Sequence, residues 1–99
     1  MAQKIKVSDL PEFDMAEHLT DKKAMAEYLA IVLEEDDPGA IVGSLGTIAR
    51  ARGMTDIAEA SGITREALYR ALRPEARPRF ETIQRVCTAL GLKLTVTHS

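Results

Sequence analysis

Apolar residues recur at helical spacing over most of this 99-residue chain. The first clear run predicts a helix over residues 21–35, because apolar side chains at every third or fourth position form one buried face of a helix. Thr20 is the expected N-cap, and the acidic run 34–37 ends the helix. The residues expected on the buried face are Met25, Leu29 and Val32, widened by Tyr28 and Leu33.

A second helix is predicted to begin at Asp37-Pro38 and to end at Gly53. An acidic cap followed by proline at the first helical position is a helix start signal, and glycine is the usual residue just after a helix. Arg50 and Arg52 fall in the last turn, where cations are favoured. The predicted buried stripe of this helix consists of Ile41, Leu45 and Ile48.

Three further helices are predicted in the second half of the chain. One runs from about Thr55 to Gly62, and the next starts near Thr64 and ends before Pro74, since the residue before a proline is pushed out of helical geometry. The last covers residues 80–90 and is closed by a glycine. Its inward-facing residues are expected to be Ile83, Val86, Cys87 and Leu90.

The tail over residues 92–97 alternates apolar and polar side chains, which predicts a short β-strand. Two partners are open for this strand: residues 4–7, which alternate in the same way, or the same strand of a second subunit. Residues 1–20 form an N-terminal extension. Apart from the strand, residues 1–99 are expected to form a single all-α domain.

The composition, with 45% apolar residues, allows one modest core. No apolar run approaches the ~20 residues of a membrane span, and the first residues lack the apolar centre of a signal peptide, so a cytoplasmic protein is expected. A single cysteine, Cys87, excludes an internal disulfide and a cysteine-based zinc cluster. The sequence suggests no metal, no cofactor and no enzyme active site.

The net charge of −2 hides an asymmetry along the chain. Residues 1–37 contain four lysines and ten acidic residues, a balance of −6, whereas residues 38–99 contain eight arginines and one lysine against five acidic residues, a balance of +4. Arginine suits bidentate contacts with phosphate and guanine. The second part of the chain therefore mildly favours a nucleic-acid partner.

The segment 54–72 has the spacing of a helix-turn-helix, a motif whose second helix lies in the DNA major groove. Ala58 supplies the small residue needed where the helices meet, and Gly62 supplies a turn residue that tolerates positive φ. The apolar residues expected to clamp the two helices are Ile57, Ile63 and Leu68. The alternative is a pair of ordinary packed helices whose arginines face water.

The outer face of the second helix carries side chains suited to DNA. Arg65 and Arg70 can each pair with guanine, and Glu66 can accept from cytosine or orient an arginine. Tyr69 can donate to a phosphate or pack on a thymine methyl, and hydroxyl groups at helix N-termini suit phosphates. The full set of expected DNA-binding residues is Thr55, Thr64, Arg65, Glu66, Tyr69, Arg70, Arg73, Arg77 and Arg79.

Short segments along most of the chain are similar to one known family. The main ones are Leu45-Gly46, Ile48-Ala49-Arg50-Ala51, Gly53-Met54, Ala58, Gly62, Arg65-Glu66, Leu68-Tyr69, Ala71-Leu72, Thr82-Ile83 and Ala89-Leu90-Gly91-Leu92. In these the chain resembles the addiction-module antidotes of the HigA type, a branch of the Xre/Cro-like helix-turn-helix regulators. One departure is Ala76-Arg77-Pro78 before the last helix, where the family usually has Gly-Asn-Pro.

The resemblance implies a five-helix lambda-repressor-like fold and a homodimeric, DNA-binding antitoxin. Such a protein represses its own operon and neutralises a small basic ribonuclease toxin of the RelE/HigB kind. Two alternatives stay open. The chain can be a lone regulator without a cognate toxin, or a protein-interaction module in which acidic residues 1–37 bind a basic partner and DNA binding is weak.

Overall fold

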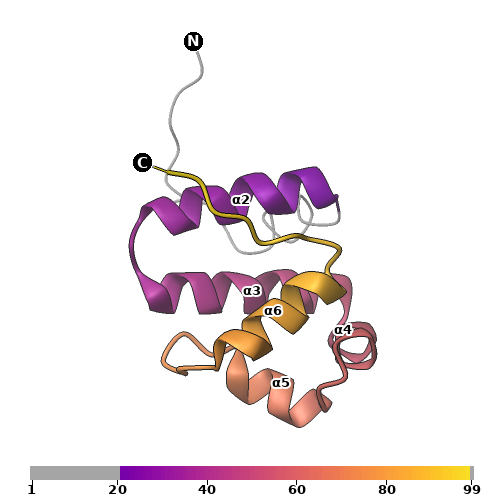
Figure 1. Cartoon of the computed structure of the whole chain (residues 1–99). Helices are drawn as coiled ribbons and strands as arrows, with labels where there is room; N and C mark the ends of the chain where they lie inside the picture. The colour runs from indigo at the N-terminus through magenta and orange to yellow at the C-terminus, as the bar shows by residue number, and fades with distance from the viewer. Residues whose placement is uncertain (1–20, 99) are drawn as a thin grey trace.

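The computed structural model describes residues 21–98, and within this range the chain forms five helices. They are α2 (Lys22–Glu34), α3 (Pro38–Arg52), α4 (Met54–Ser61), α5 (Arg65–Ala71) and α6 (Phe80–Ala89). The all-α prediction is confirmed over this range, and the predicted strand at residues 4–7 lies outside it. Figure 1 shows α2 and α5 on opposite sides of α3. None of the helices within residues 21–98 combines the length and the hydrophobicity that a membrane span requires.

The start and the buried face of α2 differ from the prediction at two residues. The N-cap is Asp21 rather than Thr20, because the backbone of Asp21 is extended and its carboxylate accepts from the Lys23 N–H at 3.4 Å. Leu33 does not widen the buried face, since its side chain is 51% exposed. Val32 precedes Leu33 by about 100° around the helix, so Val32 faces inward and Leu33 does not.

Helix α3 begins and ends at the predicted residues. The Asp37 carboxylate accepts from the backbone N–H groups of Gly39 (3.0 Å) and Ala40 (3.3 Å), Pro38 is the first helical residue, and Gly53 ends the helix with φ 104°. These local interactions satisfy N–H groups that have no partner inside the helix. The predicted boundaries of α3 are therefore confirmed.

Helices α2 and α3 are joined by a partly buried polar contact as well as by apolar packing. The Tyr28 hydroxyl donates to Ser44 Oγ at 3.1 Å, and Ser44 Oγ donates to the Ala40 carbonyl at 2.7 Å. Ser44 is buried, and its hydrogen bonds offset the cost of removing the hydroxyl from water.

Three glycines on α3 let the chain after α5 approach its backbone closely. A Cβ atom on Gly46 would lie 2.8 Å from the Leu72 carbonyl oxygen, and one on Gly39 would lie 2.9 Å from the Pro74 carbonyl oxygen. A Cβ on Gly43, between them, would lie 3.1 Å from Pro74 Cγ. Their spacing puts all three on one helix face, so the end of α5 and the start of the following loop pack directly on α3.

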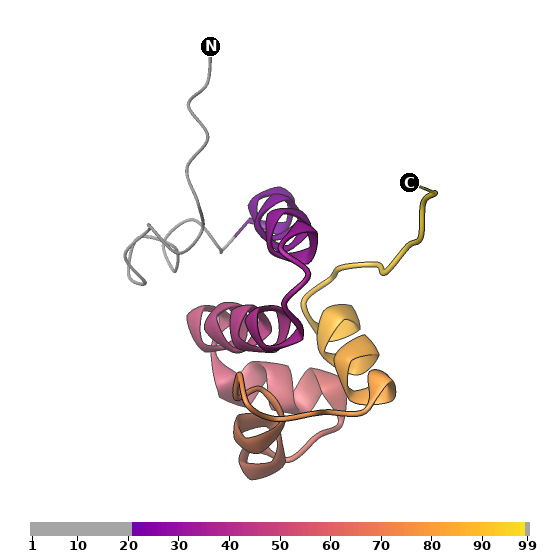
Figure 2. The same cartoon turned by 90° about the vertical axis from the view of Figure 1, so that its left-hand side faces the viewer.

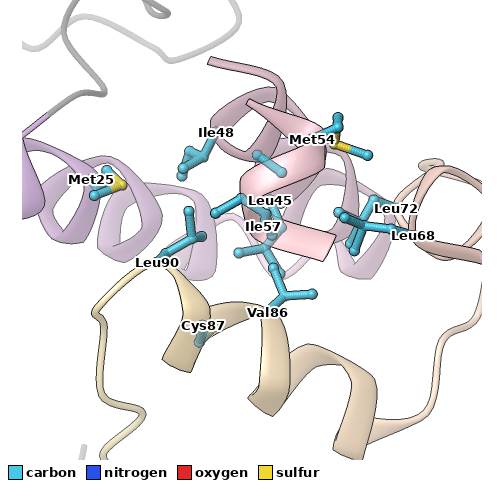
Figure 3. Packing of buried hydrophobic residues seen from close by; sticks show 11 residues of the cluster. Met25, Leu45, Ile48, Met54, Ile57, Leu68, Leu72, Val86, Cys87 and Leu90 are labelled. Atoms are coloured by element: carbon cyan, nitrogen blue, oxygen red, sulfur yellow. The ribbon is translucent and has the colours of Figure 1, made fainter. Parts of the chain in front are cut away.

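One apolar cluster joins all five helices of the described range. Figure 3 shows Met25 of α2 at one end of this cluster and Leu68 with Leu72 at the other. Leu45 and Ile57 lie between the two ends. The core therefore connects α2 to α5 through a continuous set of contacts.

The predicted strand over residues 92–97 does not form within the described chain. Residues 92–98 leave α6 without helix or strand and run toward the side of the molecule where α2 lies (Figures 1 and 2). A strand needs a partner for its ladder, and no strand occurs in residues 21–98 to supply one. Pairing with a second subunit stays a prediction.

Candidate nucleic-acid interface

A tight turn sets the angle between α4 and α5. Gly62 has φ 73°, and the N–H groups of Gly62 and Ile63 both donate to the Ala58 carbonyl, at 3.0 and 3.2 Å. Ser61 Oγ accepts from the Ile63 N–H at 3.4 Å and donates to Ala58 at 3.3 Å. A Cβ on Gly62 would meet nothing within 4 Å, so the position requires glycine for its backbone conformation and not for space.

Helix α5 is held by one cap and a few buried side chains. Thr64 precedes it in extended conformation, and its Oγ accepts from the Ala67 N–H at 3.2 Å. Leu68 is completely buried and Leu72 nearly so. Of the predicted clamp, Ile57 and Leu68 are buried, and Ile63 is partly buried against the core cluster. These contacts leave the opposite face of the helix uncovered.

The exposed face of α5 carries the predicted side chains. Arg65, Glu66, Tyr69 and Arg70 are all exposed. The Arg65 guanidinium lies over the Tyr69 ring, with Cζ 5.6 Å from the ring centroid. At an exposed site such a cation–π contact stabilises by about 0.5–1 kcal/mol, enough to favour one orientation of Arg65.

The loop between α5 and α6 carries three exposed arginines, Arg73, Arg77 and Arg79. Pro74, packed on α3, fixes the beginning of the loop. Thr55 is exposed in the first turn of α4. All nine residues predicted to bind DNA are therefore exposed, on α4, α5 and the loop after α5.

Two other residues of α6 that could take part in chemistry make contacts within the chain. Cys87 lies in the core cluster, and burial raises the pKa of its thiol, which disfavours the reactive thiolate. Arg85 pairs with Glu81 one turn earlier on α6, at 3.3 Å. This pair lies on a different helix from the arginines of α5.

Two features near this surface have no signal in the sequence pattern. Phe80, the first residue of α6, is 69% exposed. An open cleft of about 680 Å³ lies between the beginning of α3, the loop and α6. Helical periodicity could not find either one, because the cleft is formed by segments far apart in sequence and the first residue of a helix lacks a preceding turn to cover it.

Taken together, these features define a small helical protein with an arginine-bearing face on its shortest described helix. A family model described as "probable addiction module antidote protein" matches residues 9–98, and the chain belongs to this family. The chain is also similar to an uncharacterized protein of Haemophilus influenzae, with 46% identity over 90 residues, which cover 91% of this chain and 93% of the relative. No solved structure matches it. The resemblance to addiction-module antidotes is thus confirmed at the level of the family.

Proposed function

We propose that this antidote is a cytoplasmic, sequence-specific DNA-binding repressor of the HigA type that acts as a homodimer on its own operon. In this proposal α4, the turn at Gly62 and α5 form a helix-turn-helix of the lambda-repressor-like kind, and α5 lies in the major groove. A two-fold dimer would present two such helices to half-sites ~34 Å apart. The protein acts by binding and not by catalysis.

The observation that supports this proposal best is the division of α5 into two faces. Leu68 anchors one face in the core, while Arg65, Tyr69 and Arg70 are exposed on the other. A recognition helix needs this arrangement, because its buried face fixes its orientation and its exposed face must reach the base edges.

The exposed residues divide into those suited to bases and those suited to phosphates. Arg65 and Arg70 are the candidates for guanine, with Glu66 for cytosine. Thr55, Thr64 and the loop arginines Arg73, Arg77 and Arg79 are the candidates for the backbone. Phosphate contacts place the protein on the duplex, and the base contacts select the sequence.

The test is a gel-shift titration with DNA from upstream of the gene, run across a salt series. Arg65→Ala or Arg70→Ala should each weaken binding to this DNA by ~1–3 kcal/mol while affecting unrelated DNA little, if the residue reads a base. Binding should also fall steeply with salt, because phosphate contacts release counterions.

Arg85→Ala is the matched control, because it removes an exposed arginine that pairs with Glu81 on α6 and faces no proposed DNA contact. It should bind the upstream DNA as the wild type does. If Arg65→Ala and Arg70→Ala also bind like wild type, α5 does not read this DNA.

An antidote implies a toxin partner, and the acidic end of α2 favours a basic one. Glu34, Glu35, Asp36 and Asp37 are consecutive and all exposed. We therefore propose that a small basic toxin of the RelE/HigB kind, encoded next to this chain, binds the acidic part of the protein. Charge complementarity of this sort speeds association and selects the partner.

A second candidate function is that of a protein-interaction module without specific DNA binding, which the same acidic run favours.

Co-purification with the product of the neighbouring gene tests the proposed binding of a toxin. Reversing charges at Glu34 and Glu35 to lysine should reduce capture and make it less sensitive to salt. Unchanged capture would remove the acidic end of α2 from the toxin-binding surface.

A further inference from the structure

Two side chains on the exposed face of α5 are in contact with each other. The guanidinium of Arg65 lies over the ring of Tyr69, with Cζ 5.6 Å from the ring centroid. The two residues are four positions apart, a spacing that makes them neighbours on a helix surface. Tyr69 is 40% exposed, so its ring is accessible at the surface. The contact therefore belongs to the proposed DNA-binding face and not to the core.

The backbone beneath this pair is held in place, so the position of the guanidinium depends on the side chain of Arg65 alone. Thr64 caps the helix directly before Arg65, since its Oγ accepts from the Ala67 N–H at 3.2 Å. Leu68, directly before Tyr69, is completely buried. Ordering an arginine side chain costs more conformational entropy than ordering most others. The Tyr69 ring lowers that cost, because it favours one position of the guanidinium before any partner binds.

The ring and a guanine base can hold the same guanidinium at the same time. A ring attracts a guanidinium through its flat face, whereas the paired hydrogen bonds to guanine O6 and N7 use N–H groups that point outward in the guanidinium plane. A ring that covers one face of the Arg65 guanidinium therefore leaves these donors available. The ring is also neutral, so it does not compete for them as a carboxylate would.

Arg70, on the same face of α5, has no support of this kind. It is exposed, and within residues 21–98 neither a cation–π contact nor an ion pair involves its guanidinium. An arginine that must be ordered on binding suits a phosphate, because several phosphate oxygens can accept its hydrogen bonds and no single orientation is required. The two arginines of α5 thus differ in how well they are prepared for a base.

We infer that Arg65 is the residue of α5 that selects a guanine, that Tyr69 is a positioning residue which acts through Arg65, and that Arg70 contributes affinity through phosphate. The role of Tyr69 uses its ring and not its hydroxyl group. The inference rests on the proposed DNA-binding function and deepens it, since it assigns the choice of base to one of two candidate arginines.

The first measurement compares binding of the full chain to two DNA fragments of equal length, one from upstream of the gene and one unrelated. Tyr69→Leu keeps an apolar side chain but removes the ring, so it should weaken upstream binding about two- to fivefold and leave unrelated binding unchanged. Tyr69→Phe keeps the ring and should bind as the wild type does. Equal losses on both fragments overturn the inference, and so does a loss in Tyr69→Phe as large as in Tyr69→Leu.

The second measurement identifies the base and the residue that contacts it. Each guanine of the upstream fragment is replaced in turn by 7-deazaguanine, which lacks the N7 acceptor. The wild type should lose about fivefold or more in affinity at one particular guanine, whereas Arg65→Ala should lose nothing there, because it lacks the contact already. Tyr69→Leu should lose less than the wild type at this guanine.

A double variant tests whether Tyr69 acts through Arg65. Tyr69→Leu should have no further effect in the Arg65→Ala background, because no guanidinium is left for the ring to position. An effect of undiminished size in that background shows that Tyr69 acts independently of Arg65 and overturns the inference.

Arg70→Ala provides the contrast. It should weaken binding to both fragments to a similar extent, reduce the salt slope by about one, and keep the sensitivity to 7-deazaguanine. If Arg70→Ala abolishes this sensitivity and Arg65→Ala does not, the assignment of the two arginines is wrong. Arg85→Ala on α6 is the matched control and should bind both fragments like the wild type. Circular dichroism checks that every variant is folded.

The outcomes separate this inference from the proposed function. A wild type that binds upstream DNA no better than unrelated DNA refutes the proposed repressor function and the inference with it. A wild type that binds upstream DNA selectively, but reads no guanine through Arg65, refutes the inference alone.

Discussion

Helices α3 and α5 meet at Gly46 and Leu72 but are built in different ways. Helix α3 has fifteen residues and buries six of them, whereas α5 has seven residues and buries only Leu68. The residues of α3 that approach α5 include glycines, and those of α5 that face away include arginines. Helix α3 therefore supplies the surface against which the end of α5 packs.

The difference shows how α5 can be exposed on one side and still stay folded. A seven-residue helix is too short to be stable alone in water. It is stabilised here by the Thr64 cap, by Leu68 in the core and by close packing of its end on Gly46. Because these contacts use one side of α5, the other side stays available for a partner.

Truncation of Leu68, the one buried residue of α5, should have the largest effect on stability. Leu68→Ala is expected to lower the free energy of unfolding by ~2–5 kcal/mol, because it leaves a cavity where a completely buried side chain was. Urea denaturation followed by circular dichroism measures the loss. Arg70→Ala, on the exposed face of the same helix, should change stability by less than about 0.5 kcal/mol. Equal losses from the two variants would contradict the two-faced description of α5.

A methyl group added at a glycine of α3 that contacts the end of α5 should have an intermediate effect on stability. Gly46→Ala places a Cβ 2.8 Å from the Leu72 carbonyl, a backbone atom that cannot move alone, so a loss of about 1–3 kcal/mol is expected. Gly43→Ala meets only the Pro74 ring, at 3.1 Å, and should cost less. Thermal melts of both variants test this order. If Gly46→Ala is stabilising, as alanine is at an unobstructed helical position, the close approach of α5 to α3 is wrong.

Two of the capping side chains, Asp37 and Thr64, should show the smallest effect and should differ in what else they change. Asp37→Ala and Thr64→Ala each remove an N-cap, at a cost of about 1 kcal/mol in unfolding free energy. Thr64→Ala should in addition weaken binding to upstream DNA, because it loosens the start of α5, whereas Asp37→Ala at the start of α3 should not. Serine at position 64 should keep both properties. DNA affinity lowered equally by the two variants would place the effect in global stability.

The sequence predicted most helix boundaries well, because the signals for them are local. Asp37, Pro38 and Gly53 delimit α3, and Gly62 forms the turn before α5, each by a requirement of its own side chain or backbone. The candidate DNA-binding residues of α5 were likewise found from their spacing on this helix. Their exposure agrees with the prediction, whereas their contact with DNA stays a prediction.

The errors arose where a residue depends on segments distant in the sequence. Leu33 matches a helical period but lies beside the buried face, because the direction of α3 sets which side of α2 is covered. The alternation over residues 92–97 is a real pattern, yet a strand forms only if another strand lies alongside. The local pattern specifies neither the direction of α3 nor a partner strand for residues 92–97.

By itself, therefore, the sequence determined most of the helix boundaries in the described range and which residues of α5 are suited to DNA. Caps, turn glycines and helical spacing act over a few residues, so they can be read along the chain. Only the tertiary structure decided that Leu72 and Pro74 rest on glycines of α3 and that Phe80 stands exposed beside a cleft. These features depend on the packing of helices separated by many residues, and packing is set by the whole core.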